Sequence, residues 1–197
     1  MTSFYAEFVF DGYLEDSWET IVNNISAGNI ESYGLGGIKT SEITYTCEGV
    51  TYTDTVDFEI IGINHDELES GGKAALTFKG ALSAKRAMNN GDKTFGGFTG
   101  IAEGGWPLSD MRAWLNSEEF ISSLDPALQV GLKTVLKVSD QGRSSYYEAG
   151  DTKTPLAEPA YVNSADKIFI PSTTELNLTY GLTGANQGVT YPMFTNN

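Results

Sequence analysis

The sequence predicts an α+β fold with a mixed, mainly antiparallel sheet, two to four short helices and long loops. Aromatic residues make up 12% of the 197 residues, glycine occurs 22 times, and only 19% of residues are charged. This composition is typical of turn-rich proteins that contain strands, and not of helical bundles or disordered tails. A chain of this length can bury a sizeable core as one compact domain.

The N-terminal part predicts a strand and then a helix. Residues 1–10 alternate between apolar and other side chains, as in a strand. Asp16 and Glu19 resemble a capping box, and Gly28 is placed to end the helix. The apolar stripe between them consists of Trp18, Ile21, Val22 and Ile25.

The next segment predicts paired strands. Residues 43–47 and 50–58 are rich in β-forming residues and flank Glu48 and Gly49, as in a hairpin. The apolar run 58–63 continues the second arm as a central strand, and residues 76–78 form another strand.

Beyond residue 80 the expected elements are shorter. We expect a helix at 84–88, a loop at 89–103, a helix that starts at Asp125, and a strand at 135–138. Residues 141–162 are predicted to be an irregular excursion.

The C-terminal part is expected to hold little regular structure. Residues 168–170 predict a strand, and Ser172 with Glu175 predicts a capping box that opens a short last helix. Residues 181–197 are rich in Gly, Asn and Thr and have no terminating element, so we expect a linker or a segment that docks on a neighbour.

The segment 104–120 carries the most information. Ser109 is a good N-cap, and Met111, Trp114 and Leu115 then share one face of a short helix. We interpret Trp106 and Trp114 as core anchors and Arg112 as a donor to nearby groups. In the alternative interpretation, Trp106 faces a ligand.

Two groups of residues in this region match a known pattern. The first is Trp106, Ser109, Met111, Arg112, Trp114, Leu115, Asn116 and Phe120, and the second is Asp166, Lys167, Phe169, Ser172 and Glu175. They resemble a domain family of unassigned function from gut Firmicutes and their prophages. Segments 16–28 and 56–78 are similar to the same family.

The resemblance implies a C-type-lectin-like domain of the kind used in phage receptor-binding tips. We therefore expect an N-terminal strand or arm at 1–15, a lectin-like domain at 16–180 and a tail at 181–197. Longer relatives continue into a second half, which is expected to be missing from this chain or supplied by another one.

The leading functional hypothesis is a non-catalytic virion component of a bacteriophage, as a tail, fibre or decoration subunit. It implies self-association, contacts with other virion subunits, host adhesion through a glycan or surface protein, and location in the virion. Aromatic side chains stack on sugars, so the candidate ligand residues are Trp106, Tyr146, Tyr147 and Tyr161. The alternatives are a bacterial carbohydrate- or protein-binding module and an enzyme.

Charge and composition argue against several other classes. The formal net charge is −14, and the twelve Lys and Arg residues form no cluster in the sequence, which argues against nucleic acid binding. No apolar run is long enough to span a bilayer, so we expect no membrane insertion. Residues 1–10 do not resemble a signal peptide, so we expect cytoplasmic synthesis without export. Cys47 is the single cysteine and is expected to be a buried apolar residue.

The sequence offers little for catalysis or metal binding. His65 is the only histidine, and the common nucleophile and phosphate-binding motifs are missing. A glycosidase needs only two carboxylates, but nothing in the sequence singles out a pair. Asn64, Asp66 and Glu67 could offer oxygen ligands to calcium, although they lack the spacing of an EF-hand loop. We expect no cofactor and no transition-metal site.

Overall fold

The chain folds around a four-stranded sheet. The computed structural model describes residues 9–89, 94–95, 98–99, 105–140, 161–178 and 187–195. The strand order is β1-β2-β3-β4, with β1 parallel to β2 and the other pairs antiparallel. The strands are β1 (Val9–Tyr13), β2 (Leu35–Cys47), β3 (Val50–Ile63) and β4 (Leu76–Lys79). The predicted α+β class with a mainly antiparallel sheet is confirmed.

Two smaller antiparallel pairs complete the strands of the described residues. They are β5 (Thr94–Phe95) with β6 (Phe98–Thr99), and β7 (Val135–Asp140) with β8 (Tyr161–Asp166). The α-helices are α1 (Trp18–Ala27), α2 (Asp110–Leu115), α3 (Glu118–Ile121) and α4 (Pro126–Gly131), and 3-10 turns cover Trp106–Leu108 and Pro192–Phe194. No helix in the described ranges is long and apolar enough to cross a membrane.

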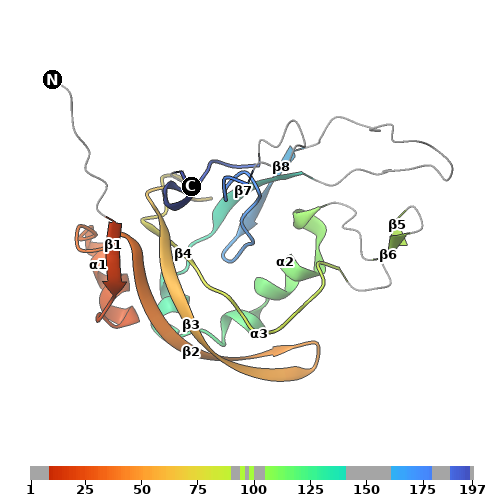
Figure 1. The fold of residues 1–197 in the computed structure, drawn as a ribbon, viewed down its shortest axis with the longest axis horizontal. Helices are drawn as coiled ribbons and strands as arrows, with labels where there is room; N and C mark the ends of the chain where they lie inside the picture. The colour runs from red at the N-terminus through yellow and green to blue at the C-terminus, as the bar shows by residue number, and fades with distance from the viewer. Residues whose placement is uncertain are drawn as a thin grey trace.

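Figure 1 shows β2 and β3 as one long, curved ribbon. Helices α2 and α3 lie on its concave side, and the β7-β8 pair lies on the other side of these helices. Helix α1 lies next to β1, at the opposite end of the ribbon from the hairpin turn. The curved hairpin therefore encloses the region where the core forms.

Local sequence signals account for the first half of the fold. Helix α1 ends at Gly28, which has the predicted left-handed conformation. Its N-cap is Ser17, whose side chain accepts a hydrogen bond from the Thr20 amide, so the predicted capping box at Asp16 and Glu19 is wrong by one residue. The β2-β3 hairpin turns at Glu48 and Gly49 as predicted, since both have the positive φ of a tight hairpin turn. β2 begins at Leu35, well before the expected start.

Three predicted elements differ from the structure. Residues 84–88 are not helical. The backbone there bonds to distant residues instead, because the Ala84 amide donates to the Tyr45 hydroxyl and the Met88 carbonyl accepts from the Met111 amide. Residues 168–170 are not a strand, and the last strand is instead β8, which begins at Tyr161 inside the predicted excursion. The predicted loop at 89–103 contains β5 and β6.

The C-terminal part is more ordered than the sequence suggests. Ser172 and Glu175 form the reciprocal hydrogen bonds of a capping box, but the chain makes only one turn, which Asn177 closes with a positive φ. Residues 187–195 pack back onto the fold, and Tyr191 is fully buried. The expected tail is therefore wrong for these residues, because Tyr191 anchors them in the interior.

The core consists of two clusters of buried apolar residues. One cluster lies between the β2-β3 hairpin and helices α2 and α3: Ile43, Tyr45, Cys47, Val56, Trp106, Leu115, Phe120 and Leu124. The other surrounds α1: Leu14, Trp18, Ile21, Tyr33, Leu35 and Ile60. Phe58 and Leu128 are partly buried and pack against both clusters. Cys47 is buried and free, as predicted.

Candidate functional site

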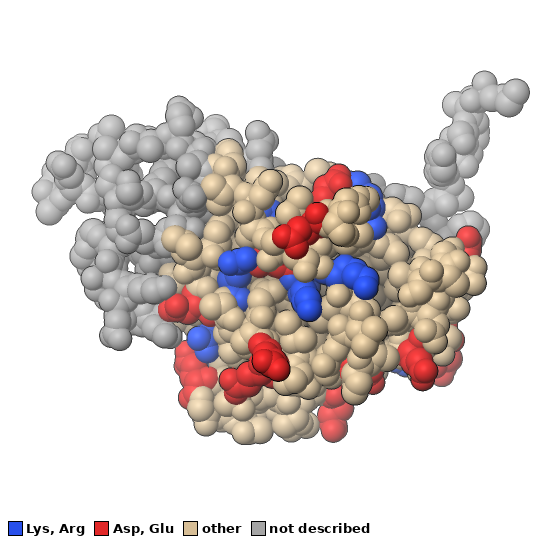
Figure 2. Space-filling model, turned by 180° about the vertical axis from the view of Figure 1, so that it is seen from behind, with Lys and Arg blue, Asp and Glu red and all other residues tan. Residues whose placement is uncertain are grey.

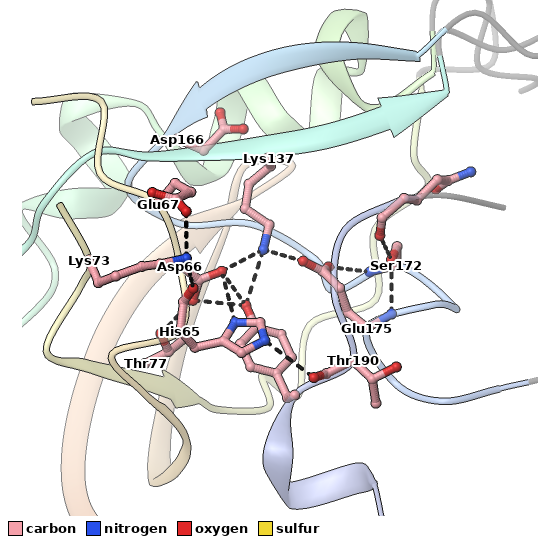
Figure 3. Close-up of polar contacts among 12 residues, drawn as sticks. His65, Asp66, Glu67, Lys73, Thr77, Lys137, Asp166, Ser172, Glu175 and Thr190 are labelled. Carbon is pink, nitrogen blue, oxygen red and sulfur yellow. Dashed lines mark hydrogen bonds and ion pairs between the residues drawn. The ribbon is translucent and has the colours of Figure 1, made fainter. Parts of the chain in front are cut away.

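A buried group of charged and hydroxyl side chains lies where three distant segments meet. It comprises Asp66, Thr77, Lys137, Glu175 and Tyr191, which we call the Lys137 cluster (Figure 3). Their relative exposures range from 0 to 9%. Burying charges is costly unless they are paired and hydrogen-bonded, so the contacts within the cluster decide its role.

Lys137 is at the centre of the cluster. Its Nζ donates to Asp66 Oδ1 at 2.8 Å, to Tyr191 Oη at 3.1 Å, and to Glu175 Oε1. These three acceptors match the three protons of an ammonium group. Nζ also lies 4.0 Å from the centre of the Phe169 ring, a favourable distance for a cation-π contact.

The carboxylates are satisfied as well. Asp66 Oδ2 accepts from Thr77 Oγ1 at 2.5 Å, and Tyr191 Oη lies 2.9 and 3.1 Å from the two Asp66 oxygens. Glu175 Oε2 accepts from the Ser172 amide at 2.9 Å. Every charged group of the cluster therefore has partners inside the protein.

Backbone pairing brings Asp66 to Lys137. The turn after β3 runs beside β7, where the Leu136 amide donates to the Glu67 carbonyl and the Glu69 amide donates to the Thr134 carbonyl. This pairing places residue 66 next to the buried face of β7. Lys137 is on that face, opposite Ser164 of β8.

Two glycines make room for the C-terminal segment. A Cβ atom on Gly62 would lie 3.0 Å from the Tyr191 ring, and one on Gly188 would lie 2.7 Å from Glu175 Oε1. Gly188 also has φ +89°, which side chains other than glycine rarely adopt. These two positions allow Tyr191 and Glu175 to reach Lys137.

The surroundings shift two pKa values in opposite directions. Burial by itself raises the pKa of Asp66, but neighbouring His65 and the charge and hydrogen bond of Lys137 hold the pKa well below its usual range. Burial raises the pKa of the Tyr191 hydroxyl far above its usual value, and the negative charges of Asp66 and Glu175 add to this effect. Asp66 therefore stays ionised and Tyr191 stays neutral across the physiological range.

His65 lies at the edge of the cluster. Its ring is 4.2 Å from the Tyr191 ring, centre to centre, and Nε2 is 3.2 Å from the Thr190 carbonyl oxygen. Nδ1 is buried without a hydrogen bond, 3.6 Å from Asp66 Oδ1. His65 thus packs the C-terminal segment against the turn that carries Asp66.

The motif residues form a second buried group around Asp166, which is fully buried. Its Oδ2 accepts from Trp106 Nε1 at 3.0 Å and from Ser164 Oγ at 2.5 Å, and its Oδ1 accepts from Arg112 Nε at 2.5 Å. The other guanidinium nitrogens of Arg112 donate to the carbonyls of Pro107 and Ala165. This group joins the 3-10 turn, α2 and β8.

Asn116 connects α2 to the segment after β8. Its Oδ1 accepts from the amides of Lys167 and Ile168, and its Nδ2 donates to the Ile168 carbonyl at 2.8 Å. The side chain amide thus pairs with the backbone as a neighbouring strand would. At Ile168, this pairing takes the place of a strand partner.

Of the four aromatic residues predicted to bind a ligand, the structure describes Trp106 and Tyr161. Trp106 is 91% buried and its indole N–H is used by Asp166, which fits its interpretation as a core anchor. Trp114 is partly buried in the same cluster and donates to the Thr46 carbonyl. Tyr161 is the first residue of β8, whereas Tyr146 and Tyr147 lie outside the described residues.

The oxygen atoms considered for calcium point to other partners. The Asp66 carboxylate contacts Lys137, and Glu67 pairs with Lys73 at 2.5 Å (Figure 3). In the described part of the chain, no three His, Cys, Asp or Glu side chains are placed to hold a metal ion.

A large cavity is lined by residues of both core clusters and has a volume of about 590 Å³. Its walls include Ile21 from α1, Phe58 from β3 and Leu128 from α4. A smaller cavity of about 240 Å³ touches Lys137, Glu175 and Trp106. The larger one falls within the usual size range of small-molecule sites and has their apolar character.

Sequence reasoning missed Lys137 and Tyr191 as parts of a site. A signal was present for Lys137, since a single lysine interrupts the apolar strand 135–138. Tyr191 gave no such signal, because it lies in a segment rich in Gly, Asn and Thr.

The chain matches no protein-family model, no curated protein and no solved structure.

Proposed function

We propose that the protein is a non-catalytic assembly and binding subunit, used as a tail, fibre or decoration component of a phage virion. The observation that carries the non-catalytic part is the pairing within the Lys137 cluster. All three Lys137 protons and both carboxylates have partners inside the fold, so these groups stabilise the junction of three segments and leave no free acid or base.

The outer edge of the main sheet supports an assembly role. β1 is the first strand of the order β1-β2-β3-β4, so in the described part of the chain its outer edge has no partner. Tyr13, at the end of this strand, is 64% exposed. An open edge can pair with a strand of a neighbouring subunit, which is a common way to build an assembly.

The virion setting rests on the resemblance of the motif residues to the prophage family. The groups around Asp166 and Asn116 use Trp106, Arg112 and Asn116, which are residues of that motif, to hold the fold together. A C-type-lectin-like core remains part of this proposal.

The second candidate is a free-standing bacterial binding module. The cavity of about 590 Å³ favours it, because a subunit that only builds a particle has no need for an interior apolar site.

Light scattering of the purified protein, together with negative-stain images, tests the proposal. We expect a defined oligomer, ring or filament that Tyr13→Asp weakens by introducing a charge at the β1 edge. Val50→Asp, at an exposed apolar position in the distal hairpin, is the matched control and should leave assembly unchanged. A monomer of about 21.3 kDa at all concentrations would contradict assembly and favour the binding module.

A further inference from the structure

The large cavity lies at the division between the two halves of the core. Ile21 and Trp18 border it from the α1 cluster, and Val56 and Phe120 border it from the hairpin cluster. A core of this size is normally packed without voids much larger than a water molecule. A cavity of about 590 Å³ with aromatic and aliphatic walls can therefore hold an apolar body.

The charged residues of the cavity walls are strongly biased toward one sign. Lys79, Arg86, Lys133 and Lys167 are four of the twelve cations in the chain. In contrast, Asp66 is the only Asp or Glu among the described residues that line the cavity, and its carboxylate is paired with Lys137. In Figure 2, Lys and Arg side chains lie close together across the middle of one face, with Asp and Glu above and below them.

Two of these cations are free to bind an anion. Within the described residues, neither Lys133 nor Lys167 forms an ion pair, and both are exposed. Lys79, by comparison, is paired with Glu59 at 2.6 Å. In a protein with a net charge of −14, unpaired cations at an apolar cavity indicate charge complementarity to a ligand.

Two buried donors in the walls have no partner. Arg86 Nε makes no hydrogen bond, and its guanidinium lies 5.2 Å from the centre of the Trp114 ring. Trp18 Nε1 also has no partner, although the residue is 96% buried and packs edge-on against Phe58 and Phe78. Buried donors without acceptors are rare and costly, and a ligand oxygen beside Arg86 can satisfy the Arg86 donor.

We propose that this cavity binds an amphipathic carboxylate of the fatty-acid type. The apolar tail lies between the two core clusters, and the carboxylate is held by Arg86 and Lys167 beside the end of α2. Trp114, against which Arg86 stacks, and Asn116, which binds the Lys167 backbone, both belong to that end of the helix. Arginine is the preferred side chain for a planar carboxylate in a partly desolvated place.

Three probes with the same tail separate the contributions of head group and tail. Dodecanoate, dodecanol and dodecyltrimethylammonium are titrated into the full chain by calorimetry, below the concentration at which each forms micelles. We expect dodecanoate to bind about ten-fold more tightly than dodecanol, and the cationic probe to bind least. Equal affinities for the three probes, or no binding of dodecanoate, would overturn the proposal.

Variants test the head-group contacts. Arg86→Gln and Lys167→Gln should each weaken dodecanoate about five-fold and leave dodecanol unchanged. Lys85→Gln is the matched control, because Lys85 is an exposed cation next to Arg86 that does not border the cavity. If the control weakens dodecanoate as much as the other two, the effect is one of overall charge and the assigned contacts are wrong.

The position of the tail is tested by methyl NMR in the presence of dodecanoate. The methyl groups of Ile21, Leu82 and Leu128 border the cavity, so their signals should shift. Leu178 is exposed elsewhere, and its signals should not shift. Shifts that are confined to exposed apolar residues such as Leu178 would show surface adsorption and contradict the site.

Discussion

Lys137 Nζ lies 2.8 Å from Asp66 Oδ1, although the two residues are 71 positions apart in the sequence. Asp66 follows the longest strand of the main sheet, and Lys137 belongs to a separate two-stranded sheet. Their ion pair, with Glu175 and Tyr191 added from the C-terminal segment, ties three parts of the chain together.

Lys137→Met should destabilise the protein by about 3–5 kcal/mol, because it leaves two carboxylates buried without their cation. Urea unfolding followed by circular dichroism measures the change. Lys73→Met is the matched control, since its pair with Glu67 is largely exposed and such pairs contribute about 1 kcal/mol or less. Equal losses of unfolding free energy for the two variants would show that burial of the Lys137 cluster does not increase its contribution to stability.

Stability should fall in acid through Asp66. Its folded-state pKa is depressed, so the unfolded chain takes up the proton first as the pH drops below the ordinary value of 3.8. The contribution of ionised Asp66 to the free energy of unfolding is complete above this pH and is lost as the pH falls below it. Asp66→Asn should reduce the slope of unfolding free energy against pH in this range, and an unchanged slope would contradict the assignment.

Stability should also fall in alkali through Tyr191. Its folded-state pKa is raised, so the unfolded chain releases the proton first above the ordinary value of 10.0. Tyr33 and Tyr45, whose pKa values burial also raises, contribute in the same direction. Tyr191→Phe should therefore reduce, without abolishing, the loss measured by unfolding between neutral pH and pH values above 10.

Trp106→Phe separates the hydrogen bond of the Trp106 indole from its packing in the core. The variant keeps most of the ring but leaves Asp166 Oδ2 with one donor fewer, so we expect a loss of about 1–3 kcal/mol. Trp106→Ala also removes the packing and should cost about 3–5 kcal/mol. Thermal unfolding of both variants checks the order, and a Phe variant as stable as the parent would leave the hydrogen bond without a role.

Asn116→Asp tests the pairing of a side chain with backbone. Aspartate keeps the acceptor for the Lys167 and Ile168 amides, but a carboxylate oxygen replaces the Nδ2 donor and faces the Ile168 and Arg112 carbonyls. We expect Asn116→Ala to cost about 1–3 kcal/mol and Asn116→Asp to cost at least as much, because the carboxylate repels these two carbonyl oxygens. Hydrogen exchange at the Ile168 amide should be fast in the Ala variant and slow in the Asp variant.

Several elements follow directly from local chemistry. Ser109 and Asp125 cap α2 and α4 as predicted, and Glu48-Gly49 supplies the two positive φ angles of the hairpin. The interpretation of Trp106 as a core anchor also followed from the sequence around it. For the two caps and the hairpin turn, the signal and the structure it specifies lie within a few residues of each other.

Predictions from local sequence patterns were wrong where the backbone bonds to a distant residue instead of forming the expected helix or strand. Residues 84–88 have helix-forming composition, but their backbone bonds to Tyr45 and Met111 instead of forming a helix. Residues 168–170 have strand composition, but the backbone of Ile168 bonds to the Asn116 side chain instead of a neighbouring strand. The Ser172 capping box forms, yet the turn stops because Asn177 adopts a left-handed conformation.

The sequence by itself determined the α+β class, the caps of α2 and α4, the hairpin turn and the burial of Cys47 and Trp106. The tertiary structure alone decided that Asp66, Lys137, Glu175 and Tyr191 meet, and that an apolar cavity with cations in its walls separates two core clusters. Capping and turn formation depend on residues a few positions apart, whereas ion pairing and cavity formation depend on how distant segments pack.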